Sequence, residues 1–256
     1  MHVAVVGGGL AGLAVSVGLA DVGWKVTLIE KRPAFDHQGS TLSLAVNGQK
    51  ALREICPDAL STILMQGIEQ EDGAFLLGWW MIRDALLYQV RLRKDRIIVH
   101  NGWSLQAIAN NDDDKNLVRA TFESLDEKQS QTTLEADLLI GADGVNSATR
   151  RCLGFSSAIL TGATCWRCRV DVDLSSSLHH HEVLRPLLEQ GPTPIGKFYG
   201  ETFINVFNYH EKLPGTMSYV ISTKASVPDG AHPQTVLGKH NVEPEEQDIL
   251  AALYAL

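Results

Sequence analysis

The sequence predicts an α/β fold in which a domain with a parallel sheet is followed by a smaller domain with an antiparallel sheet. Residues 2–30 predict the first domain, because two short apolar runs flank a helical stretch that begins among three spaced glycines. A third apolar run, at 138–140, leads into another glycine turn. After residue 162, strand-like stretches separated by polar loops predict the second domain.

The composition limits the classes of function. The 256 residues are 45% hydrophobic, enough for one large domain or two small ones, and the net charge of −8 argues against a nucleic-acid partner or a polybasic membrane anchor. The longest apolar run, at 7–20, is shorter than the roughly 20 residues of a membrane span, so no transmembrane segment is expected. The four cysteines form no disulfide framework in so long a chain, which favours a cytoplasmic location.

The N-terminal segment has the order strand, turn, helix and strand. HVAVV at 2–6 is a short buried strand, and residues 10–22 are apolar nearly all round, as in a helix packed on a sheet. Gly23 ends this helix, and KVTLIE at 25–30 forms the second strand. This order predicts a Rossmann-like unit.

The rest of the first domain continues with helices and strands. Helical spacing predicts helices at 45–55 and 82–93. Strands are predicted at 73–80, 96–100, 117–124 and 132–143, with a hairpin loop at 110–116. The change of pattern places the boundary within 155–162 and predicts domains at 1–158 and 159–256.

The second domain is expected to be an antiparallel sheet with strands at 163–173, 197–209 and 216–223. Cys165 and Cys168 form a C-x-x-C pattern, but positions i and i+3 of a strand point to opposite faces, so two unrelated cysteines are predicted. The histidines at 179–181 are adjacent and do not face one way, so a plain loop at 175–181 and no metal site are expected. At 243–256 a helical pattern stops without a cap, which suggests a truncated form of a longer protein.

Three glycines after the first strand form the pattern G-x-G-x-x-G. Gly7 permits the tight turn, Gly9 lets the backbone approach a pyrophosphate, and Gly12 lets the helix pack closely on the strand. The helix N-terminus, at Leu10 and Ala11, then offers free N–H groups and a positive dipole end to phosphates.

An acidic residue ends the second strand. The Glu30 carboxylate lies where it can accept hydrogen bonds from a ribose diol, which disfavours NADPH because a 2′-phosphate would meet like charge there. Lys31 and Arg32 face either solvent or the adenosine end of a ligand. These residues leave FAD, NAD and a glycine-rich turn without a ligand all open.

A second glycine motif, DLLIGADGVNSATR, occupies residues 137–150. Its apolar strand places Asp143 and Gly144 at a carboxyl end, where open α/β sheets bind ligands. Ser147 is expected to cap the following turn, and Arg150 to pair with an acid or a phosphate.

Together the two motifs resemble those of the FAD-dependent aromatic hydroxylases. This family of single-component flavoprotein monooxygenases includes the p-hydroxybenzoate and salicylate hydroxylases and, further off, zeaxanthin epoxidase. The spacing through Ser16, Gly23 and Glu30 resembles the adenosine-binding fingerprint of FAD-dependent oxidoreductases, with Ser16 where alanine is more usual. IRDALLYQV resembles the family's helix whose arginine, here Arg83, contacts FAD.

The resemblance implies a Rossmann-like FAD-binding domain, a partial antiparallel substrate domain, and an activity. NAD(P)H reduces bound FAD, and O2 then forms a C4a-hydroperoxyflavin that transfers one oxygen atom to an aromatic or polyene small molecule. No catalytic side chain is identified. The implied cofactor-binding residues are Gly7, Gly9, Leu10, Ala11, Gly12, Glu30, Lys31, Arg32, Arg83, Asp143 and Gly144.

Two departures from the family pattern support a second hypothesis. The segment at 49–83 is short, and the family's third signature, a Gly-Asp-Ala-Ala-His type turn that holds the flavin's ribityl chain, does not occur. The alternative is therefore a truncated, catalytically incomplete flavoprotein that binds FAD weakly or not at all. A third possibility, an NAD-dependent oxidoreductase, needs a Tyr/Lys or His/acid catalytic set after the Rossmann-like unit, and none is evident.

Overall fold

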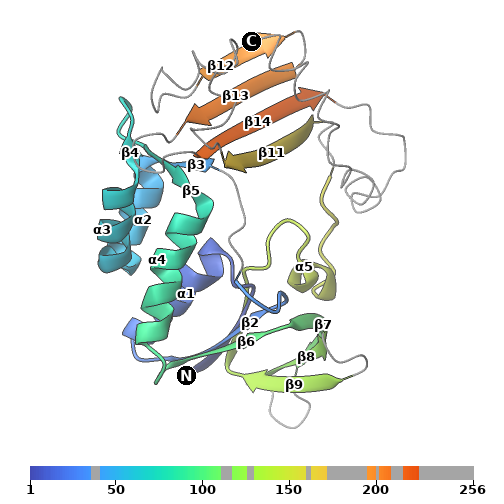
Figure 1. The fold of residues 1–256 in the computed structure, drawn as a ribbon. Coiled ribbons are helices and arrows are strands. Elements are labelled where there is room, and N and C mark those ends of the chain that lie inside the picture. The colour runs from blue at the N-terminus through green and yellow to red at the C-terminus, as the bar shows by residue number, and fades with distance from the viewer. Residues whose placement is uncertain are drawn as a thin grey trace. The chain divides into compact units, whose positions relative to one another are not determined.

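The computed structural model describes residues 1–35, 41–110, 117–125, 130–159, 163–171, 195–199, 202–208 and 216–224. The chain forms two compact units, Met1–Gln38 with Ser43–Ala158, and Gly39–Leu42 with Ile159–Leu256 (Figure 1). The predicted loop at 175–181 and the helical pattern at 243–256 lie outside the described residues, as does the 110–116 loop apart from Asn110.

A four-stranded parallel sheet forms the centre of the first unit. Its strand order is β10-β1-β2-β6, with β1 at His2–Val6, β2 at Lys25–Glu30, β6 at Ile97–Asn101 and β10 at Leu138–Gly141. Val3, Val5 and Leu28 are completely buried, as expected for the central strands of a parallel sheet covered on both faces. The carboxyl ends of β1, β2 and β10 therefore lie together at one edge of the unit.

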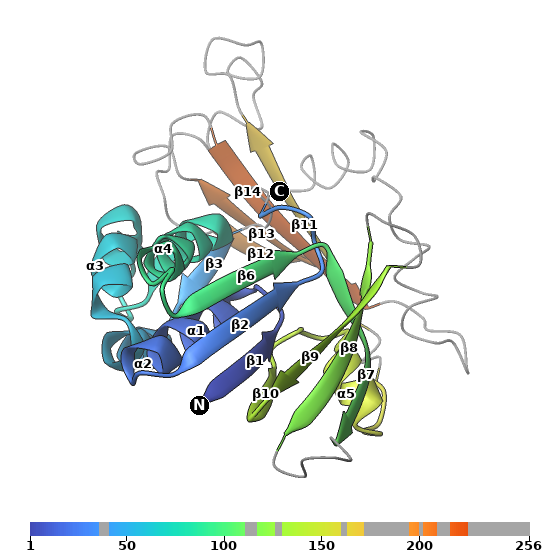
Figure 2. The same cartoon turned by 90° about the horizontal axis from the view of Figure 1, so that it is seen from below.

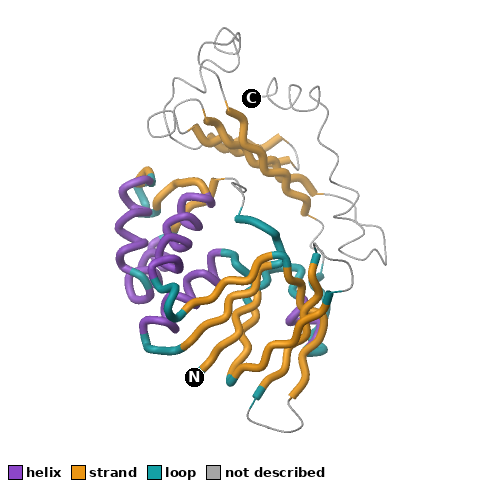
Figure 3. Tube along the Cα trace, turned by 60° about the horizontal axis from the view of Figure 1, so that its bottom comes forward, coloured by secondary structure: helices purple, strands orange, loops and turns teal. Residues whose placement is uncertain are grey.

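Helices cover one face of this sheet, and an antiparallel sheet covers the other (Figure 2). Figure 3 shows the helices grouped beside the strands of the first unit. The helices are α1 (Leu10–Asp21), α2 (Val46–Ile55), α3 (Pro57–Gln66) and α4 (Trp79–Leu92). The antiparallel sheet has the order β7-β8-β9, with β7 at Trp103–Asn110, β8 at Val118–Ser124 and β9 at Gln131–Ala136. Phe122 of β8 packs with Ala4, Val6 and Ile29 in the core between the two sheets.

Three short strands form a further sheet, and one short helix follows β10. The order β3-β5-β4 joins β3 (Thr41–Leu44), β5 (Phe75–Gly78) and β4 (Ile68–Glu69), and α5 spans Ala148–Cys152. None of the helices within the ranges given above combines the length and the apolar character that a membrane span requires.

The strands of the second unit form one antiparallel sheet. Its order is β11-β14-β13-β12, with β11 at Ala163–Asp171, β12 at Ile195–Tyr199, β13 at Thr202–Asn208 and β14 at Thr216–Lys224. The predicted fold class, a parallel sheet accompanied by an antiparallel one, is confirmed. Cys165 and Cys168 both lie in β11, so the prediction that this stretch is a strand is also confirmed.

The predicted single strand at 132–143 is wrong, because the chain changes sheets at Asp137. β9 pairs antiparallel with β8, whereas β10 pairs parallel with β1. The Asp137 N–H donates to the carbonyl oxygen of His2 over 3.0 Å, and the His2 N–H donates to Asp137 Oδ2 over 2.6 Å. Asp137, which directly follows β9, is thus hydrogen-bonded to His2 of β1 in the parallel sheet.

Two further points of the predicted secondary structure need correction. The strand predicted at 73–80 ends at Gly78, and Trp79 and Trp80 already belong to α4. A Cβ at Gly78 would lie 2.5 Å from the Trp80 ring, so the indole packs directly on the glycine that separates strand from helix. The helix α3 was not predicted, although Pro57 at its first position and Asp58 in its first turn are ordinary signals of a helix start.

Candidate cofactor site

A pocket of about 300 Å³ opens at the carboxyl ends of β1, β2 and β10. This is the edge of an open α/β sheet at which ligands bind. The structure brings eight of the predicted residues to its lining: Gly7, Gly9, Glu30, Lys31, Arg32, Arg83, Asp143 and Gly144. Leu10, Ala11 and Gly12, which were also predicted, lie in the first turn of α1 and are not part of that lining.

The glycine loop is closed on two sides and open on a third. Gly7 has a φ of +107°, and a Cβ there would lie 2.5 Å from the carbonyl oxygen of Ala142. A Cβ at Gly12 would overlap the carbonyl oxygen of Gly7. At Gly9, by contrast, a Cβ would meet no atom of the described residues within 4 Å. The loop therefore packs tightly against α1 and the Ala142 turn, and Gly9 faces the open pocket.

The N-terminus of α1 supplies donors beside Gly9. The Leu13 N–H donates to the Gly9 carbonyl over 3.0 Å, which is the first bond of the helical ladder. The N–H groups of Leu10, Ala11 and Gly12 precede this bond, and such first-turn amides have no intrahelical partner and favour anions. Ser16 is buried, and its hydroxyl donates a hydrogen bond to the Gly12 carbonyl oxygen over 2.7 Å, so this polar group is satisfied within α1.

Glu30 is fixed across the glycine loop. Its Oε2 accepts a hydrogen bond from the Gly8 N–H over 2.6 Å, and its Oε1 accepts one from the Arg32 N–H over 2.9 Å. A carboxylate has about four acceptor sites, so two backbone bonds leave capacity for hydroxyl donors. An acceptor is thus held at the end of β2, beside Lys31 and Arg32 in the pocket wall.

Asp143 is held by the turn that follows β10. Ser147 Oγ donates to its Oδ1 over 2.6 Å, and the Thr149 N–H and Oγ1 donate to its Oδ2 over 2.9 and 3.2 Å. Burial alone would raise the pKa of Asp143, but the hydrogen bonds from Ser147, Thr149 and neighbouring backbone N–H groups outweigh it and lower the pKa below its ordinary value. Asp143 is therefore a fixed anion in the pocket wall.

Two neighbouring residues of the second motif, Ser147 and Arg150, have different outcomes against their predicted hydrogen bonds. The Ser147 hydroxyl accepts from the Arg150 N–H over 2.9 Å, which confirms the predicted cap of α5. Arg150 Nη2 donates to the carbonyl oxygen of Val145 over 2.9 Å. The bond observed for this guanidinium thus goes to a backbone carbonyl, and its pairing with an acid or a phosphate stays a prediction.

Arg83 is a buried cation in the pocket wall. Only 3% of its side chain is exposed, and its Nε and Nη2 donate to Asp84 Oδ1 over 3.1 and 2.8 Å. Its guanidinium carbon lies 5.4 Å from the centre of the Trp79 ring, within range of a cation–π interaction. Trp79 precedes Arg83 by four residues on α4, so one turn of helix brings the pair together.

Sequence reasoning missed several residues of the pocket lining. Trp79 was assigned to a strand, and with the helix start at Gly78 its spacing from Arg83 would have indicated contact. Arg151 and Trp103 line the pocket too, but only the folded sheet brings them there. With Arg151 included, four basic side chains and two acidic ones line the pocket: Lys31, Arg32, Arg83 and Arg151 against Glu30 and Asp143.

These features fit the adenosine diphosphate part of FAD. The open face of Gly9 and the amides of α1 suit a pyrophosphate, whose charge the excess of basic side chains complements. Glu30 offers the acceptor that a ribose diol requires.

Comparison with protein families identifies FAD-binding domains in both motif regions. One model described as an FAD binding domain matches residues 2–49, and another of the same description matches residues 93–208. These matches contain the glycine loop and the Asp143 turn, respectively.

Curated relatives are monooxygenases or hydroxylases by name. The FAD-dependent monooxygenase sor5 of Hypocrea jecorina is 25% identical over 169 residues, which cover 59% of this chain and 35% of that protein. The 6-methylsalicylate 1-monooxygenase atA of Aspergillus terreus is 25% identical over 202 residues, 68% of this chain and 45% of that protein. The 3-hydroxybenzoate 6-hydroxylase of Klebsiella oxytoca is 26% identical over 216 residues, 75% of this chain and 52% of that protein. The chain thus spans about half or less of the length of these relatives.

Solved structures share the fold. CtdE in complex with FAD matches with a TM-score of 0.71 and 18% identity, covering 91% of this chain and 61% of that one. Aklavinone-11 hydroxylase, in a ternary complex with FAD and aklavinone, matches with a TM-score of 0.69 and 20% identity, covering 98% of this chain and 50% of that one. The FAD-binding domain matches and the curated relatives support the resemblance to the FAD-dependent aromatic hydroxylases.

Proposed function

We propose that the pocket binds the adenosine diphosphate part of FAD, and that the protein uses NAD(P)H and O2 to insert one oxygen atom into a small aromatic molecule. The observation that carries the proposal is the convergence of three groups on one pocket. The open face of Gly9, the carboxylate of Glu30 and the carboxylate of Asp143 all line it, although they come from distant parts of the chain. The resemblance to FAD-dependent monooxygenases supports the oxygenase chemistry.

Each group has a proposed role in holding the cofactor. The first-turn amides of α1, at Leu10, Ala11 and Gly12, donate to the pyrophosphate as it lies against Gly9. Glu30 accepts hydrogen bonds from the ribose hydroxyls, and Arg83 places its charge near the phosphates.

The remaining predicted residues complete this wall. Lys31 and Arg32 flank the adenosine end, and Asp143, kept ionised by Ser147 and Thr149, accepts from a cofactor hydroxyl beside the Gly144 turn. When bound, FAD supplies the redox chemistry, because flavins accept hydride from reduced nicotinamides and react with O2. The protein's contribution is to bind, to orient and to exclude water.

The substrate class follows from the names of the relatives. 6-Methylsalicylate and 3-hydroxybenzoate are hydroxylated benzoates, so we propose an electron-rich aromatic ring of this kind as the substrate, ahead of a polyene. The cytoplasmic location expected from the cysteine usage stays a prediction.

Cofactor binding and oxygenation are tested separately, because the chain spans about half or less of the length of its relatives. The purified chain is titrated with FAD, NAD⁺ and ADP, and binding is followed by flavin fluorescence and calorimetry. We expect FAD to bind more tightly than NAD⁺, and ADP to compete with it. Selective uptake of NAD⁺ would refute the proposal at its first step.

Oxygenation is then measured on the FAD-loaded chain. NADH or NADPH oxidation and O2 consumption are recorded with and without 3-hydroxybenzoate or 6-methylsalicylate, and products are identified by mass spectrometry. Stimulated oxidation with a hydroxylated product supports a monooxygenase. Weak or absent FAD binding together with no turnover supports the alternative, a truncated, catalytically incomplete flavoprotein.

A further inference from the structure

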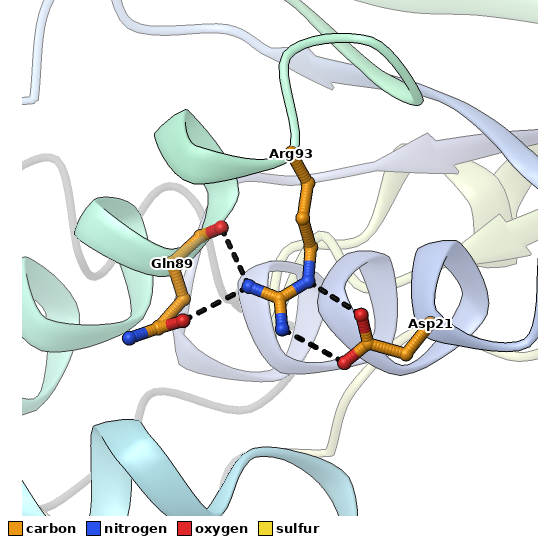
Figure 4. Close-up of polar contacts among 3 residues, drawn as sticks. All are labelled: Asp21, Gln89 and Arg93. Atoms are coloured by element: carbon orange, nitrogen blue, oxygen red, sulfur yellow. Dashed lines mark hydrogen bonds and ion pairs between the residues drawn. The ribbon is translucent and has the colours of Figure 1, made fainter.

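One arginine joins the C-terminal ends of α1 and α4. Arg93, the residue after α4, donates through Nε to Asp21 Oδ1 over 2.6 Å and through Nη2 to Asp21 Oδ2 over 2.9 Å (Figure 4). Its Nη1 donates to the backbone carbonyl of Gln89 over 3.0 Å and to Gln89 Oε1 over 2.9 Å. The guanidinium is thus fixed by four hydrogen bonds, two to each helix. We call Asp21, Gln89 and Arg93 the helix clamp.

The clamp offsets an unfavourable electrostatic interaction at the C-terminal end of α1. Asp21 is the last residue of α1, where a carboxylate faces the negative end of the helix dipole, and α1 has no basic residue in its last turn. Arg93 supplies that positive charge from another helix, and it also binds a C-terminal carbonyl of α4. The side chains of Arg93 and Asp21 are 22% and 46% exposed, so the pair is only partly screened by water.

The pocket lies at the other ends of the same two helices. Gly9 immediately precedes α1, and Trp79 and Arg83 lie in the first turns of α4. The clamp lies about 18 Å from Gly9, because the 12 residues of α1 rise about 1.5 Å each. Since both helices are continuous, the C-terminal clamp fixes how their N-terminal ends are placed relative to each other.

The rest of the contact between α1 and α4 is apolar. The two helices pack against each other, and their buried side chains include Leu13 and Val17 on α1 and Leu86 and Val90 on α4. Burial of aliphatic side chains is non-directional, so it resists separation more than sliding or rotation. A bidentate arginine–carboxylate pair is directional and fixes one register.

We propose that Arg93 and Asp21 are positioning residues for the cofactor site. By fixing α4 against α1, they hold Arg83 and Trp79 at a defined place opposite Gly9. The inference rests on the proposed function, since it requires FAD to bind in this pocket.

The test compares FAD affinity with stability in variants of the clamp. The variants are Arg93→Met, Arg93→Lys, Asp21→Asn and the double variant Asp21→Asn with Arg93→Met. The control is Arg119→Met, because Arg119 donates to Glu135 Oε1 over 2.8 and 3.0 Å between β8 and β9, and neither residue lines the pocket. FAD dissociation constants come from fluorescence titration of folded protein, and unfolding is followed in denaturant without FAD.

We expect Arg93→Met and Asp21→Asn each to weaken FAD binding about three- to tenfold, the range expected when coupling through packed elements is lost. The double variant should be no weaker than the single ones, because both remove the same interaction. Arg93→Lys should restore part of the affinity, and Arg119→Met should bind within twofold of the wild type.

Two results overturn the inference, and they are distinguishable. If the wild type binds FAD and the clamp variants lose stability but bind FAD as tightly, the clamp is merely structural. If Arg93→Met does not fold, the other single variants decide. Unchanged FAD affinity in both Arg93→Lys and Asp21→Asn then shows that the clamp is merely structural. A wild-type chain that does not bind FAD overturns the proposed function and this inference together.

Discussion

Gly9→Ala separates cofactor binding from folding. Gly9 has φ −72° and ψ −177°, a conformation that alanine also adopts, and the added methyl group meets no described atom within 4 Å. Alanine is a poorer N-cap than glycine, which destabilises the folded protein. It also reduces the conformational entropy of the unfolded chain, which stabilises the folded protein by about 0.4–1 kcal/mol. The free energy of unfolding should therefore change by less than about 1 kcal/mol.

The same methyl group would project into the proposed pyrophosphate position. Loss of two charge-assisted hydrogen bonds, at about 1.5 kcal/mol each, costs about 3 kcal/mol of binding free energy. The FAD dissociation constant should therefore increase roughly 100-fold. Gly12→Ala is the matched control, because its methyl group would overlap the Gly7 carbonyl oxygen. It should lower the free energy of unfolding by about 2–3 kcal/mol, the usual cost of overpacking.

The assay pairs FAD titration with denaturant unfolding for both variants. We expect a stable Gly9→Ala variant that binds FAD poorly and a destabilised Gly12→Ala variant, and this expectation is the one under test. It is refuted if Gly9→Ala binds FAD within threefold of the wild type, or if it loses as much stability as Gly12→Ala.

Three further predictions follow from the pocket wall. Glu30→Gln should weaken FAD binding about tenfold by calorimetry, because it removes the charged acceptor at the ribose, whereas affinity equal to the wild type would contradict that role. The pKa of Asp143 is lowered on folding, so its stabilisation is present above the ordinary value of 3.8 and is lost as pH falls through the folded pKa. Denaturant unfolding at pH 6 and pH 3 should therefore show a larger acid-induced loss for the wild type than for Asp143→Asn, and equal losses would count against it. Trp79→Leu should weaken FAD binding about two- to fivefold by removing the Arg83 contact, and it should reduce the quenching of tryptophan fluorescence by FAD; undiminished quenching would place FAD elsewhere.

The sequence allowed prediction of features that depend on neighbouring residues. The spacing of Gly7, Gly9 and Gly12 predicted the first turn, and the ends of two apolar runs predicted Glu30 and Asp143 at one sheet edge. These features are local, since strand, turn and helix start follow one another within a few residues.

Features that depend on distant contacts were not predicted. Asp137 looks like an ordinary polar residue within a strand, and only its bonds to His2 show that the chain changes sheets there. Trp103 of β7 and Arg151 of α5 both line the pocket, and only the contact of α5 with β7 in the folded chain shows that they do. Arg93 and Asp21 are 72 residues apart, and nothing in the spacing of either helix indicates that they meet.

The contact between Gly7 and Ala142 has a consequence for biosynthesis. The Ala142 N–H donates to the Val6 carbonyl over 2.7 Å, and the Ala142 carbonyl packs on the Gly7 turn, so the glycine loop is completed by a segment made about 135 residues later. On the proposed function, a nascent chain cannot complete its FAD site until the second motif has left the ribosome. Nascent chains arrested before residue 138 are therefore expected to emerge without flavin.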